Sequence, residues 1–368
     1  MREMKDSGVE WIGEIPEDWN VGKTLYALSM PITDGPHETP ELFDEGIPFI
    51  SAEAVSCGNG HIDFEHIRGF ISQEFYEECC KKYIPQINDI YMIKSGATTG
   101  KVAKVETQKL FTIWSPLAVF RVEPQRCYYE YLYYFIQSDA YQKQIENKWT
   151  YGTQQNIGMR TLEKLMICFP SITQQKLIAD YLDSKCSKID EIIEKQQAII
   201  EKLKEYKFSI ITEAVTKGIN PDVELKDSTI DMCEQIPVHW SISQNRYLFS
   251  LRDEKNYKPL EEVRLLSLYT DLGVFPHGEQ EERGNKAVKA EGYKVVYEND
   301  IVVNIILAWM GAIGRSAYDG VTSPAYDIYK PNENVCSRYY HYLYRTKPFS
   351  AECYKYGRGI MAMRWRTY

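Results

Sequence analysis

Apolar residues recur at alternating spacings of four and three along one long stretch of the chain, residues 173–217. A mean spacing of 3.5 residues is the coiled-coil period, so the pattern predicts a long helix whose apolar stripe meets another helix. Lys185 and Gln196 interrupt this stripe. Ser171 before the stretch and Gly218 after it are typical of a capped start and a stop. The stripe, called the seam below, consists of Ile178, Leu182, Ile189, Ile192, Ile199, Leu203, Tyr206 and Ile210.

At a rise of about 1.5 Å per residue, the predicted helix would span roughly 65 Å. Its eight lysines and eight acidic residues indicate a solvated outer face of balanced charge. An ordinary helix in a bundle is the alternative. We favour a spacer between two domains, because the sequences on its two sides resemble each other.

A repeated motif supports the spacer interpretation. Asp-Ser followed by Ile-Pro-x-x-Trp occupies residues 6–19, and the same frame returns 221 residues later at 227–240. Further pairs follow in the same order with drifting offsets, as expected for two diverged copies of one domain. The paired segments are 88–90 with 299–301, 96–101 with 311–315, 115–116 with 323–324, 131–133 with 342–344, 151–152 with 356–357 and 159–160 with 363–364.

Each copy mixes strand and helix signals. Short β-branched or aromatic runs alternate with glycine-containing turns, and a tyrosine-rich helical stretch follows in each copy. The predicted fold class is therefore α+β, with two similar domains separated by a long coiled-coil helix. We place the first domain at 1–170, the helix at 171–217, and a linker with an incomplete second domain at 218–368.

The composition is ordinary for a soluble protein of two or three domains. The chain has 368 residues, of which 44% are hydrophobic and 26% are charged. The longest apolar run, 301–310, is too short to cross a bilayer, and the first residues lack a signal-peptide pattern. Nine cysteines without paired spacing indicate reduced thiols. A cytoplasmic location is expected.

The net charge of −9 argues weakly against a nucleic-acid partner, but the charges are unevenly distributed. Residues 80–115 carry six lysines against two acidic residues, and residues 338–368 carry seven cations against one acidic residue. Affinity for phosphate depends on such local patches rather than on the sum. A nucleic-acid partner therefore stays open.

The motifs and their order resemble the specificity subunit of a type I restriction–modification enzyme. The resemblance covers essentially the whole chain and rests on several independent motifs. It is carried by residues 5–19, 34–40, 95–102, 152–157, 169–183 and 218–228.

The resemblance implies that each α+β unit is a target recognition domain that reads half of a bipartite double-stranded DNA site. It also implies that the helices hold the two readers apart and dock methyltransferase (M) subunits, with a restriction (R) subunit as a further partner. S-adenosylmethionine, ATP and magnesium would be used by those partners, and this chain would hold no cofactor. Two readers on a rigid helix also suit major grooves about one helical turn apart.

The glycine-rich segment 95–101 is a candidate DNA contact. It differs from a Walker phosphate loop, because three rather than four residues separate its glycines and Val102 follows the lysine. Its amides, hydroxyls and ammonium group suit a DNA phosphate or a base edge, whereas a plain hairpin turn is the alternative. The candidate residues are Ser95, Thr98, Thr99 and Lys101, with Arg315 as the expected counterpart of Lys101 in the second copy.

A second candidate contact follows the first tyrosine-rich stretch. Amide side chains bond adenine bidentately, and arginine does the same with guanine. A polar loop that caps the next element is the alternative. The candidates are Thr153, Gln154, Gln155 and Arg160 in the first copy, and Arg358 and Arg364 in the second.

Catalytic motifs are not recognisable in the sequence. No nucleophile has a familiar surrounding motif, and His37 is interpreted as a turn residue. Residues 221–226 mimic the acidic triad of a nuclease, but their carboxylates lie too close together in one linker. Methyl-donor motifs are also missing, so we expect a non-catalytic protein without a metal. The residues that could be drawn as a zinc site, with no familiar ligand spacing, are Cys57, His61, His66 and Cys79.

The second copy stops before any counterpart of the long helix, so the seam is expected to lack a partner within the chain. Burying a leucine or isoleucine is worth roughly 1.5–3 kcal/mol, and a long exposed apolar stripe favours association. The hypothesis is that two chains pair their helices antiparallel and read a palindromic site. The alternatives are an inactive truncation, completion by a separate polypeptide, and a protein–protein scaffold that does not read DNA.

Overall fold

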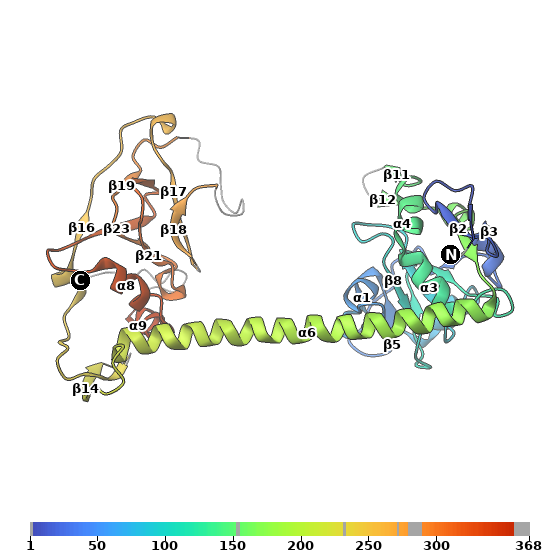
Figure 1. The fold of residues 1–368 in the computed structure, drawn as a ribbon, viewed down its shortest axis with the longest axis horizontal. Helices are drawn as coiled ribbons and strands as arrows, with labels where there is room; N and C mark the ends of the chain where they lie inside the picture. Colours follow the sequence, from blue (N-terminus) through green and yellow to red (C-terminus); the bar gives the residue numbers. More distant parts are fainter. Residues whose placement is uncertain (1–2, 152–154, 231–232, 271, 279–288, 357–368) are drawn as a thin grey trace. The chain divides into compact units, whose positions relative to one another are not determined.

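The computed structural model describes residues 3–151, 155–230, 233–270, 272–278 and 289–356. The chain divides into two compact units, Met1–Ile193 and Glu194–Tyr368, and each is described by itself (Figure 1). Both units mix helices and strands, and one long helix, α6, lies between the two domains in the sequence. The predicted α+β class is confirmed.

The first unit is organised around an antiparallel sheet. Among the residues described, its strands are ordered β4-β10-β7-β8. Their bounds are Thr33–Asp34 for β4, Leu117–Phe120 for β10, Ile90–Ile93 for β7 and Val102–Lys104 for β8. In a second sheet, β5 (Ile47–Ile50) pairs antiparallel with β6 (Gly69–Ile71) and parallel with β9 (Thr112–Ile113).

The central strand β7 is buried along its whole length. Ile90 and Met92 join one apolar cluster and Tyr91 and Ile93 join another, because successive side chains of a strand point to opposite faces. Both faces of the sheet are therefore covered by apolar side chains. The helices that contribute are α3 (Tyr129–Gln137) and α4 (Asp139–Glu146) to the first cluster, and α1 (Ala52–Cys57) to the second.

Shorter elements complete the first unit. They are β1 (Met4–Asp6), β2 (Glu14–Pro16), β3 (Asn20–Lys23), the 3₁₀ helix η1 (Thr24–Ala27), α2 (Gln73–Cys80), β11 (Thr150–Tyr151), β12 (Gln155–Asn156), α5 (Met159–Leu162) and β13 (Met166–Phe169). Strand β13 pairs antiparallel with β3, so the last strand before the long helix is tied to the beginning of the unit.

The second unit repeats the same sheet. Its strands, within the described part of the chain, are ordered β16-β23-β20-β21 and are all antiparallel. This is the order of β4-β10-β7-β8, so the duplication expected from the sequence is confirmed. The bounds are Phe249–Arg252 for β16, Tyr326–Pro331 for β23, Ile301–Asn304 for β20 and Ile313–Arg315 for β21, followed by α8 (Ser337–Leu343) and α9 (Lys347–Tyr356).

Two-stranded pairs and short helices surround this second sheet in sequence. They are β14 (Leu225–Ile230), β15 (Cys233–Pro237), α7 (Asn245–Leu248), η2 (Leu260–Glu262), β17 (Leu266–Tyr269), β18 (Gly273–Pro276), β19 (Lys294–Val296), η3 (Ala308–Met310) and β22 (Gly320–Thr322). Strand β17 pairs with β18, and β19 pairs with β22.

The repeated Asp-Ser motif forms the same hairpin in both units. Met4 faces Pro16 in the first hairpin, and Leu225 faces Pro237 in the second, so the register keeps the offset of 221. In each copy the serine hydroxyl donates to the carbonyl two residues later and accepts from the amide of that residue. The sequence motif therefore encodes a defined turn.

The Asn-Asp pair before each central strand forms a second shared turn. Asn88 has a φ of 73° and Asn299 a φ of 75°, a left-handed conformation that asparagine tolerates better than most residues. Asp89 and Asp300 each accept the amide three residues earlier, at 2.8 and 2.9 Å. The same local geometry thus starts β7 and β20.

Each of these aspartates is buried and bound by an arginine, but the arginine comes from a different strand. In the first unit, Arg121 after β10 donates to both carboxylate oxygens of Asp89, each at 2.7 Å. In the second unit, Arg252 of β16 holds Asp300 at 2.8 and 3.1 Å. Both units therefore have the buried carboxylate, but the arginine that neutralises it comes from a different strand in each unit.

Two alignments made from the sequence are wrong. Ile90 faces Lys104 and Ile301 faces Arg315, so Lys104, not Lys101, corresponds to Arg315. The sequence comparison aligned the glycines of the two turns. The glycines lie at different positions in the two turns, whereas the hydrogen bonds between the strands define which residues correspond. The alignment of the tyrosine-rich helices is also wrong. Ser138 before α4 and Thr346 before α9 make equivalent capping hydrogen bonds, so the offset between the copies is 208 residues here rather than the 211 of the sequence comparison.

The predicted long helix is confirmed as α6, Ile172–Lys217, drawn as one continuous helix in Figure 1. Its start has the predicted capping box: the amide of Gln174 donates to the Ser171 hydroxyl at 3.3 Å, and the Gln174 side chain accepts the Ser171 amide at 3.1 Å. Gly218, at a φ of 84°, follows its last residue. Glycine adopts this left-handed conformation without strain, so the helix can end there.

The first turns of α6 pack against the first unit. Ile178 contacts the apolar cluster under α3, so the expectation that the whole seam lacks a partner within the chain is wrong at this residue. Gln175 accepts the Tyr128 amide at 2.8 Å, and the Tyr134 hydroxyl donates to Asp183. Leu182 is half-buried. The remaining seam residues are exposed, namely Ile189, Ile192, Ile199, Leu203, Tyr206 and Ile210.

The buried aspartates make a testable pair. Asp89→Asn should lower the free energy of unfolding of the first unit by roughly 3–5 kcal/mol, because the Arg121 guanidinium loses its counter-charge. Urea unfolding combined with hydrogen exchange of the β7 and β20 amides separates the two units. Asp300→Asn should weaken β20 and leave β7 protected. Glu41→Gln, which removes an exposed charge of the same unit, is the control. Equal loss of protection in both units after either change would contradict this account.

Candidate nucleic-acid interface

Three loops meet at one edge of the first sheet. Because neighbouring strands are antiparallel, the end of β7 lies beside the start of β10 and the end of β4. The Lys94 amide donates to the Pro116 carbonyl at 2.8 Å, and the Ser115 amide donates to the Pro36 carbonyl at 3.2 Å. The edge therefore gathers segments 34–40, 94–101 and 114–116.

The polar hairpin β11–β12 joins the same edge. The Gly96 amide donates to the Gln155 carbonyl at 3.0 Å, and Ser95 forms a bridge with Asn156. The structure thus brings together two segments that the sequence analysis proposed separately. Gln155 is half-buried there, and Arg160 is exposed on α5. The candidates that lie outside the described residues are Thr153 and Gln154 here, and Arg358 and Arg364 in the second unit.

Within the glycine turn, the side chains have different tasks. The Thr99 hydroxyl donates to the Gly96 carbonyl at 2.7 Å, so it holds the turn. Gly100 has a φ of 94°, and the amide of Gln142 donates to its carbonyl at 3.1 Å. Lys101 is exposed, and its ammonium group lies 3.4 Å from the Ser56 carbonyl. Ser95 and Thr98 are half-buried.

The turn borders a polar cavity of about 340 Å³. Gln137 and Gln142 approach it from α3 and α4, and Asn59 approaches from the residues after α1. Lys101 and Thr99 complete the polar lining on the side of the turn. The sequence analysis missed the three amide side chains, because they come from segments far apart in the chain and share no motif.

The buried acidic residue at this edge, Asp34, is neutralised, whereas Glu38 is exposed. Asp34, buried at the end of β4, lies 2.5 Å from the ammonium nitrogen of Lys82 and 3.3 Å from that of Lys94. His37 Nε2 lies 3.1 Å from the same carboxylate. This contact gives His37 a structural role in the turn, as the sequence analysis expected. Because Asp34 is balanced by cations, the edge does not present its full negative charge to a phosphate.

The corresponding turn of the second unit is apolar. Residues 305–310 replace the threonine-containing turn, and Ile306, Leu307 and Met310 are exposed there. The Asn304 side chain accepts the amides of Ile306 and Leu307 at 3.0 and 3.1 Å, so this turn has its own internal support. The two units therefore present chemically different turns on the same strand framework.

The predicted contact Arg315 is engaged within its own unit. Its guanidinium donates to Asn299 at 2.8 Å and to Glu298 at 3.1 Å. It also lines a cavity of about 200 Å³ together with His341 and the exposed Arg338, a cation that the sequence analysis did not single out. Burial, together with the charges of Arg345 and Arg315, lowers the pKa of His341 to about 4, so this imidazole is neutral near pH 7.

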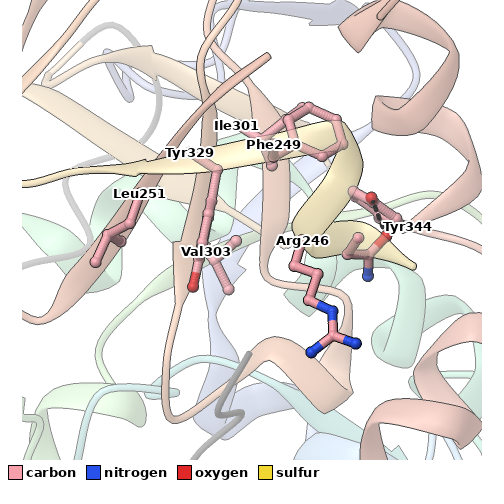
Figure 2. A pocket seen from close by; sticks show the side chains of 8 residues that line it. Arg246, Phe249, Leu251, Ile301, Val303, Tyr329 and Tyr344 are labelled. Atoms are coloured by element: carbon pink, nitrogen blue, oxygen red, sulfur yellow. Dashed lines mark hydrogen bonds between the residues drawn. The ribbon is translucent and has the colours of Figure 1, made fainter. Parts of the chain in front are cut away.

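An apolar pocket of about 150 Å³ lies elsewhere in the second unit, between α7 and strands β16, β20 and β23 (Figure 2). Phe249, Val303 and Tyr329 line it, and the Tyr344 hydroxyl donates to Asn245 at 2.7 Å. Arg246 brings the cationic group seen in Figure 2. Its apolar walls offer little for reading a base edge.

The two histidines of the possible zinc set have carboxylate partners. His61 Nδ1 lies 2.5 Å from Glu106, and His66 Nδ1 lies 2.7 Å from Asp63. Within the described ranges, no group of three or more histidine, cysteine or acidic residues is arranged to hold a metal ion. None of the helices within the same ranges is long and apolar enough to cross a membrane.

Comparisons with known proteins point to one family. Residues 36–207 match the type I restriction modification DNA specificity domain, a segment that contains the edge described above except Asp34 and Gly35, and most of α6. A putative type I restriction enzyme MjaX specificity subunit from Methanocaldococcus jannaschii is 29% identical over 67% of this chain and 55% of its own length. The chain spans about half the length of the curated relatives it matches.

Solved structures share the fold. A chain from a structure on complex assembly and conformational transition of the type I R-M system has a TM-score of 0.60 at 13% identity, covering 89% of this chain and 80% of that one. The HsdS subunit from Thermoanaerobacter tengcongensis has a TM-score of 0.50 at 12% identity, covering 92% and 81%. Residues 36–207 are thus similar to the type I restriction modification DNA specificity domain, and the chain shares the fold of these solved structures.

Proposed function

We propose that this chain is a sequence-specific DNA-recognition subunit that reads a bipartite double-stranded site. The observation that carries the proposal is the edge of the first sheet, where the turn 94–101 and the hairpin β11–β12 lie together. Loops at a sheet edge can contact a groove while the strands behind them stay fixed.

The chemistry of this edge suits DNA in two ways. Lys101 is exposed and positioned for a phosphate, a contact that adds affinity for any sequence. Gln155 and the amides around the 340 Å³ cavity suit adenine, which offers one donor and one acceptor in the major groove. Arg160 would supply a guanine or phosphate contact from α5.

The two units would read different half-sites. The exposed apolar turn 305–310 suits a thymine methyl group rather than a phosphate. Arg315 would contribute through the 200 Å³ cavity that it shares with Arg338. An asymmetric target follows from this difference.

Catalysis would reside in partner subunits. We propose that M subunits transfer methyl groups from S-adenosylmethionine and that an R subunit uses ATP and magnesium, while this chain selects the sequence in the cytoplasm. The histidines described above each contact a group of their own unit: His37, His61 and His66 lie beside carboxylates, and His341 accepts the Arg315 amide. These contacts support a binding role for this chain.

Selection from a random duplex pool tests the proposal. The purified chain, alone and with an M subunit, should enrich a bipartite motif in gel-shift selection, with affinity that falls as salt concentration rises. A pool without any enriched motif in the assembled complex would sink the DNA proposal and favour the protein–protein scaffold.

A single substitution sharpens the test at the edge. Lys101→Ala should weaken binding to all duplexes and reduce the slope of log affinity against log salt by about one, the signature of a lost phosphate contact. Lys109→Ala, an exposed lysine of the same unit whose ammonium lies over the Phe64 ring, is the matched control. A position-specific loss of about 1–3 kcal/mol would instead make Lys101 a base contact.

We also propose that α6 is buried by another helix along its exposed seam. A second copy of the chain, paired antiparallel, could supply that helix, because residues 187–210 are exposed throughout. Burying each isoleucine or leucine contributes roughly 1.5–3 kcal/mol, which is the driving force for association.

Light scattering on the purified chain tests self-association. A homodimer should dissociate when Ile192→Asp and Leu203→Asp place two carboxylates in the seam. Glu205→Gln, on a different face of α6, should leave the mass unchanged. A dimer that survives the double substitution would place the interface elsewhere.

A further inference from the structure

The apolar pocket of the second unit (Figure 2) has walls that match a buried core in the first unit. Strand register identifies the counterparts, because both central sheets have the same strand order. The pairs are Phe249 with Leu28, Ile301 with Ile90, Val303 with Met92 and Tyr329 with Phe120. All four residues of the first unit belong to one apolar cluster. The pocket therefore lies where the first unit places its own buried side chains.

In the first unit, the segment of α5 and β13 covers this place. Leu162, Leu165 and Ile167 are fully buried in the same cluster, and Phe169 packs against it. Leu165, Ile167 and Phe169 occupy alternate positions, as expected for one face of a strand. The Thr24 amide donates to the Leu165 carbonyl at 2.7 Å and continues the pairing of β3 with β13. An added strand thus completes this side of the core.

In the second unit, the same side is uncovered. Residues 241–244, which correspond to β3 at the motif offset of 221, are exposed and form no strand within the described part of the chain. Asn245, directly after them, lines the pocket. Leu251, also in the pocket wall, is 59% exposed, whereas Ile32, at the same register position, is 5% exposed. An exposed backbone segment and an exposed apolar wall therefore flank the pocket.

The occupant of this place comes from outside the 368 residues of one chain. The repeated Met-Arg pair, 159–160 with 363–364, sets an offset of 204, which places the counterparts of residues 165–169 after Tyr368. A second copy could offer only its own β13, which is already paired with β3 and buried in its first unit. A different polypeptide with a segment of the same chemistry fits both the pocket and the exposed backbone.

We propose that the second unit binds a strand from a separate polypeptide, with large apolar side chains alternating along one face. The strand pairs with residues 241–244, and its apolar side chains enter the pocket, so that main-chain bonds give affinity and the pocket gives specificity. Asn245 stands where Thr24 binds the covering strand. Its side-chain oxygen accepts the Tyr344 hydroxyl, so its NH₂ group can donate to an incoming carbonyl. The proposal concerns a protein partner and holds independently of DNA reading.

A peptide of residues 157–170, with Cys168→Ser to prevent oxidation, is the probe for this site. Its fluorescently labelled form should bind the full-length chain at one site, because the first unit's own segment occupies the equivalent place there. Hydrogen exchange at residues 241–244 should slow when the peptide binds, and exchange in β3 should stay unchanged. Absence of saturable binding would overturn the proposal.

Two N-methylated forms of the peptide report strand pairing. The amides of Ile167 and Phe169 face β3 in the native register, so methylating both should weaken binding about tenfold or more. The Met166 amide points away from β3 and donates to the Gln144 side chain at 2.8 Å. Methylation at Met166 and at position 168 should therefore leave the affinity nearly unchanged. Equal binding of the two methylated peptides would contradict the strand pairing and overturn the proposal.

Substitutions in the chain locate the site. Leu251→Asp changes an exposed side chain of the pocket wall and should weaken peptide binding about tenfold. Ile219→Asp, which changes an isoleucine that is 92% exposed and does not line the pocket, is the matched control. Circular dichroism confirms that both variants keep the native helix and strand content. A Leu251→Asp chain that binds the peptide normally would also overturn the proposal.

Discussion

The buried aspartate before each central strand is the constraint on which each unit depends. Asp89 holds the turn that starts β7 and is itself held by Arg121, and Asp300 with Arg252 repeats this arrangement. An uncompensated carboxylate at such a site would cost several kcal/mol, so the pair must form for the strand to start where it does. Because β7 is fixed at this end, the turn at its other end is fixed too. The position of the candidate interface at the end of β7 therefore depends on the Asp89–Arg121 pair at the start of the same strand.

The exchange of the arginine between strands shows what the fold requires. A guanidinium reaches the carboxylate from β10 in one unit and from β16 in the other, with similar distances. The requirement is thus neutralisation at the strand start rather than a residue at a fixed position. The same logic applies to the turns at the other edge, where a threonine-containing segment and an apolar segment connect equivalent strands. The framework is conserved while its surface chemistry differs.

The sequence predicted the features that depend on local periodicity and local turns. The length of α6, its Ser171 capping box and the duplicated hairpins all follow from such patterns. The sequence did not predict features that depend on the register between distant strands. The alignment of Lys101 with Arg315 was wrong because glycine positions do not determine how strands pair. The sequence also failed for Gln137 and Gln142, which only the packing of α3 and α4 brings to the turn. A periodic seam cannot reveal which of its residues the first unit covers, as it does for Ile178.

The exposed middle of α6 determines how stiff the connection between the two domains is. Between residues 187 and 210 every side chain is exposed, so this segment lacks tertiary packing within the described chain. Its helical state rests on intrinsic propensity and on a few local pairs, such as Lys204 with Glu201 and Gln197 with Glu201. In proteins, most of the stability of a helix comes from tertiary packing rather than from propensity. A helix that covers the seam therefore shifts the local helix–coil equilibrium, and the stiffness of the connection becomes a property of the assembly rather than of the chain.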